Sequence, residues 1–173
     1  MWGERMKHTK ALALSALLIA LALGLSFMER FIPLHLLIPL PGVKLGLANI
    51  VTLTALYLLG TKRACVILTI RCVLGSVFGG GVMGLAFSLT GGLLAMSVMA
   101  LAKKAPWLSV YGVSVLGAAA HNLGQIGVAM VLMNSVYVIG YLPYLLAVSI
   151  PMGLVTGTVA AGTFRGLRAA KYC

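Results

Sequence analysis

The chain has 173 residues, of which 61% are hydrophobic and 9% are charged, and its 13 Lys and Arg residues against two acids give a net charge of +11. About a quarter of the residues of a soluble domain are usually charged. Because the mean hydropathy is +1.10, too few polar side chains exist to cover a water-facing surface. The composition excludes a soluble enzyme, a nucleic-acid-binding module and a disordered tail, and it indicates a polytopic membrane protein.

The acidic residues are Glu4 and Glu29, and the chain contains no Asp. Paired-carboxylate glycosidase chemistry, carboxylate-held magnesium and Ser-His-Asp triads all need acids that are missing here. The chain also has no ATP-binding G-x-x-x-x-G-K-[ST] loop and no Cys-x-x-Cys pair. We therefore expect no enzyme activity, no catalytic residue, no metal site and no cofactor.

Six apolar stretches predict six transmembrane helices in one all-α domain covering residues 1–173. The basic flank before the first stretch leaves a cleaved signal peptide as the alternative to a retained helix. Between the first two stretches, residues 29–44 contain Pro33, Pro39 and Pro41. Three prolines exclude a regular helix, so this segment is predicted to be an outer loop, either a lid or a re-entrant segment. The approximate spans are residues 11–28, 45–59, 64–80, 82–102, 109–133 and 140–164.

The basic residues predict the orientation of the bundle. Ten of the 13 lie at the two termini and in the turns after the second and fourth spans. Since cytoplasmic loops carry the excess of Lys and Arg, both termini are expected in the cytoplasm, with the bundle in the cell membrane. Small residues four apart, such as Ala16/Ala20 and Gly153/Gly157, predict close helix packing, although some pairs arise by chance in a chain with 21 glycines.

Polar side chains inside the spans point to a binding site. Arg71 lies eight residues after Arg63, about 12 Å along a helix and near the middle of the bilayer. His121, Asn122 and Gln125 lie within two turns of the fifth span, with His121 and Gln125 on one face.

Asn49 falls in the outer half, beneath the proline-rich loop that carries Lys44. Together these residues predict a cationic pocket that opens outward and takes a small polar, anionic or hydrogen-bonding solute. Three of these residues have a structural alternative. Arg71 would be a structural arginine that is hydrogen-bonded within the protein, His121 would form an interhelical hydrogen bond, and Asn49 would hold two helices together.

The stretch Pro41-Gly42-Val43-Lys44-Leu45-Gly46-Leu47-Ala48-Asn49, Arg71 and the His121-Asn122-x-x-Gln125 group resemble the Gx transporter family. That family is labelled heptaprenyl diphosphate synthase component I and is similar to the substrate-binding S components of energy-coupling factor transporters. The resemblance implies a six-helix bundle, a prokaryotic cell membrane and an outward-facing vitamin site. It also implies that Ala16 and Ala20 dock an energy-coupling transmembrane subunit, which works with ATPases.

Two functions follow from these observations. The first is a membrane subunit that captures a small vitamin-like, flavin-related solute for uptake through Asn49, Arg71, His121, Asn122, Gln125 and Lys44. The second is a non-catalytic membrane partner in an isoprenoid, quinone or flavin-linked electron-transfer complex. The family label names a synthase, but chain-elongating prenyl synthases hold magnesium with Asp-rich motifs, which this chain lacks.

Overall fold

The computed structural model describes residues 2–31 and 44–169, and every regular element in these ranges is helical. Pro33, Pro39 and Pro41 of the predicted outer loop lie outside the described residues. Three short segments, η1, η3 and η4, join or extend the main helices. The elements are α1 (Trp2–Met28), η1 (Glu29–Phe31), α2 (Asn49–Leu58), α3 (Gly60–Gly75), η3 (Ser76–Gly80), α4 (Gly81–Ala102), α5 (Val110–Leu132), η4 (Val136–Tyr141) and α6 (Leu142–Ala169).

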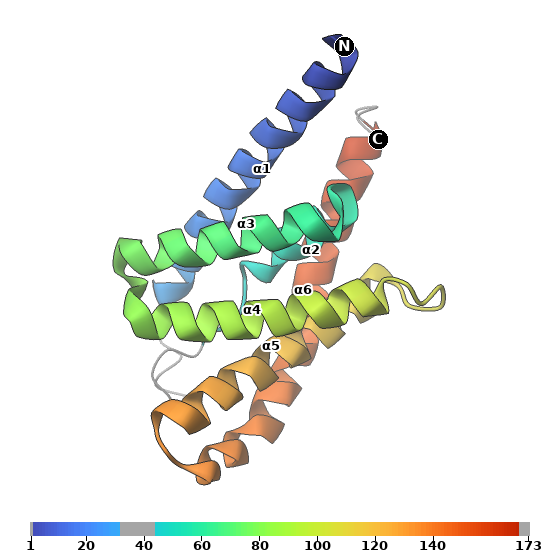
Figure 1. Cartoon of the computed structure of the whole chain (residues 1–173). Helices are drawn as coiled ribbons and strands as arrows, with labels where there is room; N and C mark the ends of the chain where they lie inside the picture. The colour runs from blue at the N-terminus through green and yellow to red at the C-terminus, as the bar shows by residue number, and fades with distance from the viewer. Residues whose placement is uncertain (1, 32–43, 170–173) are drawn as a thin grey trace.

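The described residues confirm the predicted all-helical class, and four of their segments are long and apolar enough to cross a membrane. One of them, Gly60–Ala102, is 43 residues long because α3 and α4 are joined by helical backbone. The direction reverses at Phe78 and Gly79, whose backbone angles are not helical. Figure 1 shows α3 and α4 lying side by side as a result. The other three segments are Thr9–Met28, Val110–Leu132 and Val136–Leu167.

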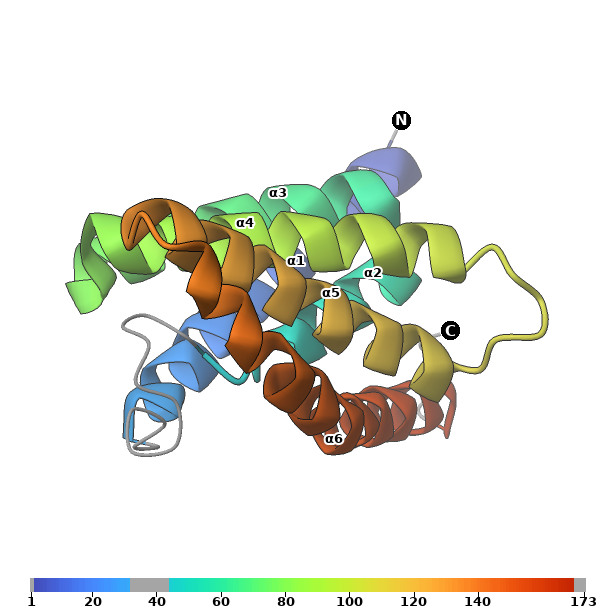
Figure 2. The same cartoon turned by 90° about the horizontal axis from the view of Figure 1, so that it is seen from below.

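The helix ends sort into two groups. Figures 1 and 2 agree that the start of α1, the α2–α3 junction, the α4–α5 turn and the end of α6 all lie toward one side of the bundle. The α3–α4 reversal and η4 lie toward the opposite side. Exposed cations of the first group include Lys10, Lys62, Lys104 and Arg165.

The helix bounds differ from the predicted spans where glycine changes the backbone. The predicted second span begins at residue 45, but α2 begins at Asn49, because Gly46 has φ +84° and residues 44–48 form an irregular segment and a turn. Gly60, with φ +81°, separates α2 from α3, which begins four residues before the predicted 64. The final helix continues to Ala169, past the predicted end at 164.

The short helix α2 lies at the centre of the bundle, in contact with α1, α3, α4, α5 and α6. Its 10 residues extend about 15 Å, half the thickness of a hydrocarbon core. Most of them are buried, and Leu53, Ala55 and Leu56 have no exposed surface. At the end of the helix, Lys103 Nζ donates to the Leu56 carbonyl oxygen at 3.0 Å. A cation in this position satisfies an end carbonyl and complements the helix dipole.

Glycines bring α4, α5 and α6 into close contact. A Cβ added at Gly124 on α5 would lie 2.7 Å from the Gly91 Cα on α4, and one at Gly153 on α6 would lie 2.5 Å from the Val115 Cα on α5. Gly157 approaches Tyr111 in the same way. The predicted packing role of the Gly153/Gly157 pair is therefore confirmed, whereas a Cβ at Gly162 would meet nothing within 4 Å.

We predict that Gly153→Ala destabilises the protein by about 1–3 kcal/mol, because the new methyl group overlaps backbone atoms that cannot move aside cheaply. The measurement is the thermal midpoint of the detergent-purified protein. Gly162→Ala is the matched control on the same helix and should leave the midpoint unchanged or raise it slightly, since alanine is the better helix former. Equal effects of the two substitutions would contradict the packing argument.

Candidate functional site

Lys44 connects three elements of the predicted site. Its ammonium group donates to Ser88 Oγ on α4 at 2.8 Å, and its backbone N–H donates to Gln125 Oε1 on α5 at 3.2 Å. Gln125, which is completely buried, in turn contacts His121 Nε2 through its Nε2 at 2.8 Å. The structure therefore joins Lys44, Gln125 and His121 in one hydrogen-bonded chain.

The direction of these hydrogen bonds determines the state of His121. The Lys44 N–H requires Gln125 Oε1 as its acceptor, so the amide NH₂ group of Gln125 faces the imidazole. His121 Nε2 must then be the acceptor, which leaves the ring proton of the neutral imidazole on Nδ1. Within the described part of the chain, His121 Nδ1 has no hydrogen-bond partner.

Asn49 and Gly46 complete this packed cluster. A Cβ at Gly46 would lie 2.9 Å from Asn49 Nδ2 and 3.2 Å from His121 Cδ2, so only glycine fits between these two side chains. A Cβ at Gly91 would lie 2.9 Å from His121 Nδ1. The amide and imidazole are thus enclosed by glycine backbone, and no described residue accepts or donates a hydrogen bond at Asn49 Oδ1.

Glu29 holds the backbone of the segment that carries Lys44. Its Oε1 accepts hydrogen bonds from the N–H of Gly46 and from the N–H of Leu47, the latter at 3.4 Å. The side chain is 5% exposed. Burial raises the pKa of the Glu29 carboxyl above its usual 4.5, while these two N–H groups and the charges of Lys44 and Arg71 act in the opposite direction.

Arg71 lies beside a small cavity at this site. Its side chain is 6% exposed, and Nε has no hydrogen-bond partner among the residues that the structure describes. The cavity has a volume of ≈ 10 Å³, room for about one water molecule. Hydroxyl groups of three helices share its wall with the two cations. The lining residues are Ser26, Lys44, Arg71, Cys72, Gly75, Ser76, Gly84 and Ser88.

The charges around the cavity do not balance. Lys44 and Arg71 supply two cations, and Glu29 is the one acidic side chain that the structure describes. Even an ionised Glu29 would leave one positive charge in excess. Since an uncompensated buried charge is costly, the arrangement favours a bound anionic group.

Asn122 is a predicted binding residue whose side chain bonds to a different part of the fold. Its Nδ2 donates to the Leu145 carbonyl oxygen of α6 at 2.8 Å, which holds α5 against α6. Ala16 and Ala20, the predicted docking residues, are both exposed on α1.

Sequence reasoning did not assign Glu29, Ser88 or Gly91 to the site. Glu29 had a usable signal, because it is the single acid near a membrane span in a chain with two acids. Ser88 had none, since serines are common within apolar helices and only the fold brings this one to Lys44. The role of Gly91 depends on its close approach to His121, which spacing along one helix does not show.

We predict that Glu29 contributes a component of stability that falls as the pH rises above about 4.5, and that Glu29→Gln removes this component from the pH profile. Because the folded protein holds the Glu29 proton more tightly than the unfolded chain, the contribution of Glu29 to the free energy of unfolding is largest below its unfolded-state pKa and declines toward its folded-state pKa. Thermal midpoints between pH 4 and 8 measure the effect. A variant with the same pH slope as the wild type would show that another group is responsible.

Comparison with known families matches the chain to heptaprenyl diphosphate synthase component I over residues 18–163. Searches of curated proteins and of solved structures give no significant match. The matched region includes α2 to α5 entirely, and with them Lys44, Arg71, His121 and Gln125. It covers most of the chain, so the resemblance drawn from the Lys44 segment, Arg71 and the fifth span is confirmed at the level of the family. The chain belongs to the heptaprenyl diphosphate synthase component I family.

Proposed function

We propose that this chain is a substrate-binding integral membrane subunit that captures a small anionic, vitamin-like solute from the outer side of the cell membrane. The observation that carries the proposal is the buried Arg71 guanidinium, which lines a cavity with Lys44 while its Nε lacks a partner among the described residues. An intramembrane arginine is costly and usually functional. A carboxylate or phosphate oxygen would satisfy Arg71 and balance the second cation.

The size of the cavity restricts which part of the solute enters it. A volume of ≈ 10 Å³ admits about one oxygen atom of an anionic group and excludes an entire vitamin. The packed cluster of Asn49, His121 and Gln125 is adjacent, since Lys44 lines the cavity and its backbone N–H donates to Gln125 Oε1. In this proposal the anionic end of the solute binds between Arg71 and Lys44, and the amides and imidazole contact its neutral part.

We further propose six membrane crossings with both termini in the cytoplasm. Support comes from the 43-residue segment, which is more than twice the roughly 20 residues that one crossing needs. The short α2 would supply a further crossing together with the residues before it. The exposed cations near the α1 start, the two junctions and the α6 end all lie toward one side, as the positive-inside rule requires of a cytoplasmic face.

Energy for uptake would come from other proteins. The chain has no nucleotide-binding loop, and its two acids are too few for the magnesium chemistry of a prenyl synthase. We therefore propose a non-enzymatic subunit, similar to the S components of energy-coupling factor transporters. An energy-coupling subunit would dock on the exposed α1 face that carries Ala16 and Ala20.

We predict that wild-type protein is stabilised against heat by the anionic member of each matched solute pair, nicotinate over nicotinamide and flavin mononucleotide over riboflavin. Arg71→Gln should weaken that binding roughly 10- to 100-fold, the usual cost of losing a charge-assisted hydrogen bond. Arg165→Gln, an exposed arginine at the end of α6, is the matched control and should bind as the wild type does. Equal binding by the Arg71 variant and the wild type would refute the proposed site.

The family description favours a second function, a non-catalytic component of a heptaprenyl diphosphate synthase complex. In that case the gently solubilised protein should co-purify with a soluble subunit rich in Asp, and adding it should raise the prenyl transfer rate of that subunit. Native mass spectrometry reads partners and ligands in one measurement. A chain that carries a water-soluble anion and no synthase subunit supports uptake, and the opposite pattern supports the synthase complex.

A further inference from the structure

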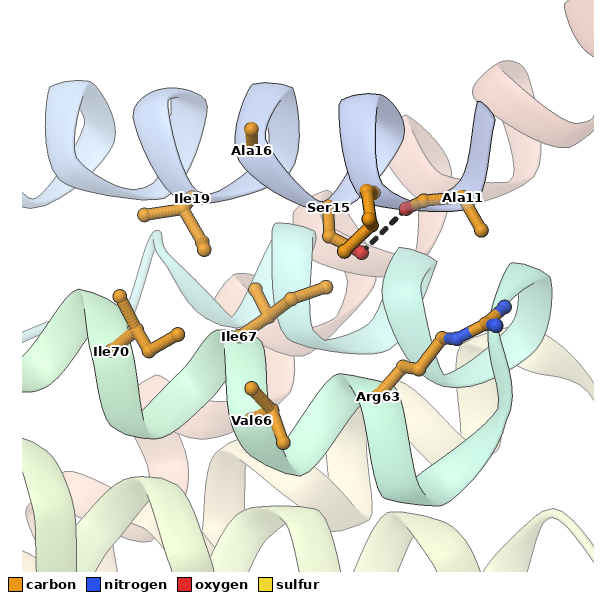
Figure 3. A pocket seen from close by; sticks show the side chains of 9 residues that line it. Ala11, Ser15, Ala16, Ile19, Arg63, Val66, Ile67 and Ile70 are labelled. Carbon is orange, nitrogen blue, oxygen red and sulfur yellow. Dashed lines mark hydrogen bonds between the residues drawn. The ribbon is translucent and has the colours of Figure 1, made fainter. Parts of the chain in front are cut away.

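A groove of ≈ 310 Å³ lies between α1 and α3 and shares no lining residue with the cationic cavity. Figure 3 shows side chains of the two helices facing each other across it. In this view the lining residues run in the same direction on both helices, from Ala11 to Ile19 on α1 and from Arg63 to Ile70 on α3. The lining residues are Ala11, Leu12, Ser15, Ala16, Ile19, Arg63, Val66, Ile67 and Ile70.

The groove is apolar except at one end. Its single hydroxyl group, on Ser15, donates to the Ala11 carbonyl oxygen at 2.7 Å and so has a partner within its own helix. Arg63 is the single charged residue of the lining, and it is exposed. Figure 3 shows Arg63 near Ala11, with Ile19 and Ile70 together toward the other end.

The described protein leaves most of α1 uncovered along this groove. Only 11% of the most apolar part of Thr9–Met28 is buried, and the main helices that α1 contacts are α2 and α3. Leu12 is 59% exposed and Val66 is 57% exposed. In a membrane these side chains face hydrocarbon, so the groove is open to lipid chains.

The charges at the Arg63 end specify the kind of lipid. Lys10 and Lys62 are exposed and adjoin the lining residues Ala11 and Arg63 in sequence. Arg63 also lies in the first turn of α3, where backbone N–H groups and the helix dipole favour an anion. Glu29, the one acid whose side chain is described, is at the opposite end of α1. Glu4 is about 10 Å further along the helix axis from Ala11.

We propose that the α1–α3 groove binds one acyl chain of an anionic phospholipid, with the lipid phosphate held by Arg63. The rise from Arg63 to Ile70 is about 10 Å, a third of the hydrocarbon core. The groove thus accommodates the part of the chain nearest the headgroup. An arginine fork pairs well with phosphate, and its aliphatic stem packs on the apolar wall. Because Ala16 lines the groove, this lipid would have to leave before a partner covers that face.

The test is native mass spectrometry of the detergent-purified full chain, titrated with phosphatidylglycerol or phosphatidylcholine of identical acyl chains. Wild type should retain phosphatidylglycerol about tenfold better, the effect of one charge-assisted contact. Arg63→Gln should remove this preference, and Ala16→Phe should reduce retention of both lipids by filling the groove. Since Arg63 is exposed, Arg63→Gln tests the proposal even if Ala16→Phe fails to fold.

Lys104→Gln is the matched control, because Lys104 is an exposed cation on the same side of the bundle but outside the groove. It should keep the wild-type preference. The proposal is overturned by equal retention of the two lipids in wild type, by an unchanged preference in Arg63→Gln, or by an equal loss in Lys104→Gln. Preferential retention of farnesyl diphosphate over phosphatidylglycerol would overturn it as well and assign the groove to an isoprenoid chain.

Discussion

The structure depends on a helix that is too short to cross a membrane and is buried among longer ones. Both ends of α2 would leave polar backbone groups in an apolar environment, where each unsatisfied group costs several kcal/mol. Glu29 accepts hydrogen bonds from the N–H groups of Gly46 and Leu47 just before the helix, and Lys103 donates to the Leu56 carbonyl near its end. The cation at the end also matches the helix dipole.

The position of the candidate site follows from this arrangement. Because Glu29 holds the backbone at Gly46, Lys44 is placed between α4 and α5, where it contacts Ser88 and Gln125. Gln125 then orients His121. A single carboxylate therefore both stabilises the central helix and organises the cationic group that we assign to solute binding. This coupling means that the site and the core are parts of one structure, and changes at Glu29 affect both.

Much of the fold was predictable because it depends on local composition. The lengths of the apolar stretches predicted the helices, and the four-residue spacing of His121 and Gln125 predicted that both lie on one helix face. The start of α2 was not predictable, since it depends on Gly46 adopting a positive φ and on a carboxylate 17 residues earlier in the chain. The separate role of Asn122 was also hidden: its neighbours in sequence point to the site, but the carbonyl it binds belongs to α6. Contacts between helices that are distant in sequence decide such roles, and the periodicity of one helix does not predict those contacts.

The reversal between α3 and α4 has a consequence for how the protein is made. This connection has no polar linker: Val77, Phe78 and Val82 are all exposed at the turn, with 86% of Val82 accessible. The insertion machinery therefore meets one continuous apolar stretch of 43 residues, with Lys62 and Arg63 near its start and Lys103 and Lys104 directly after it. Neither α3 nor α4 has a hydrophilic residue run at the reversal that could stop or restart transfer of the chain across the membrane. In the six-crossing arrangement that we propose, the two helices would enter the bilayer together as a hairpin, oriented by the flanking cations.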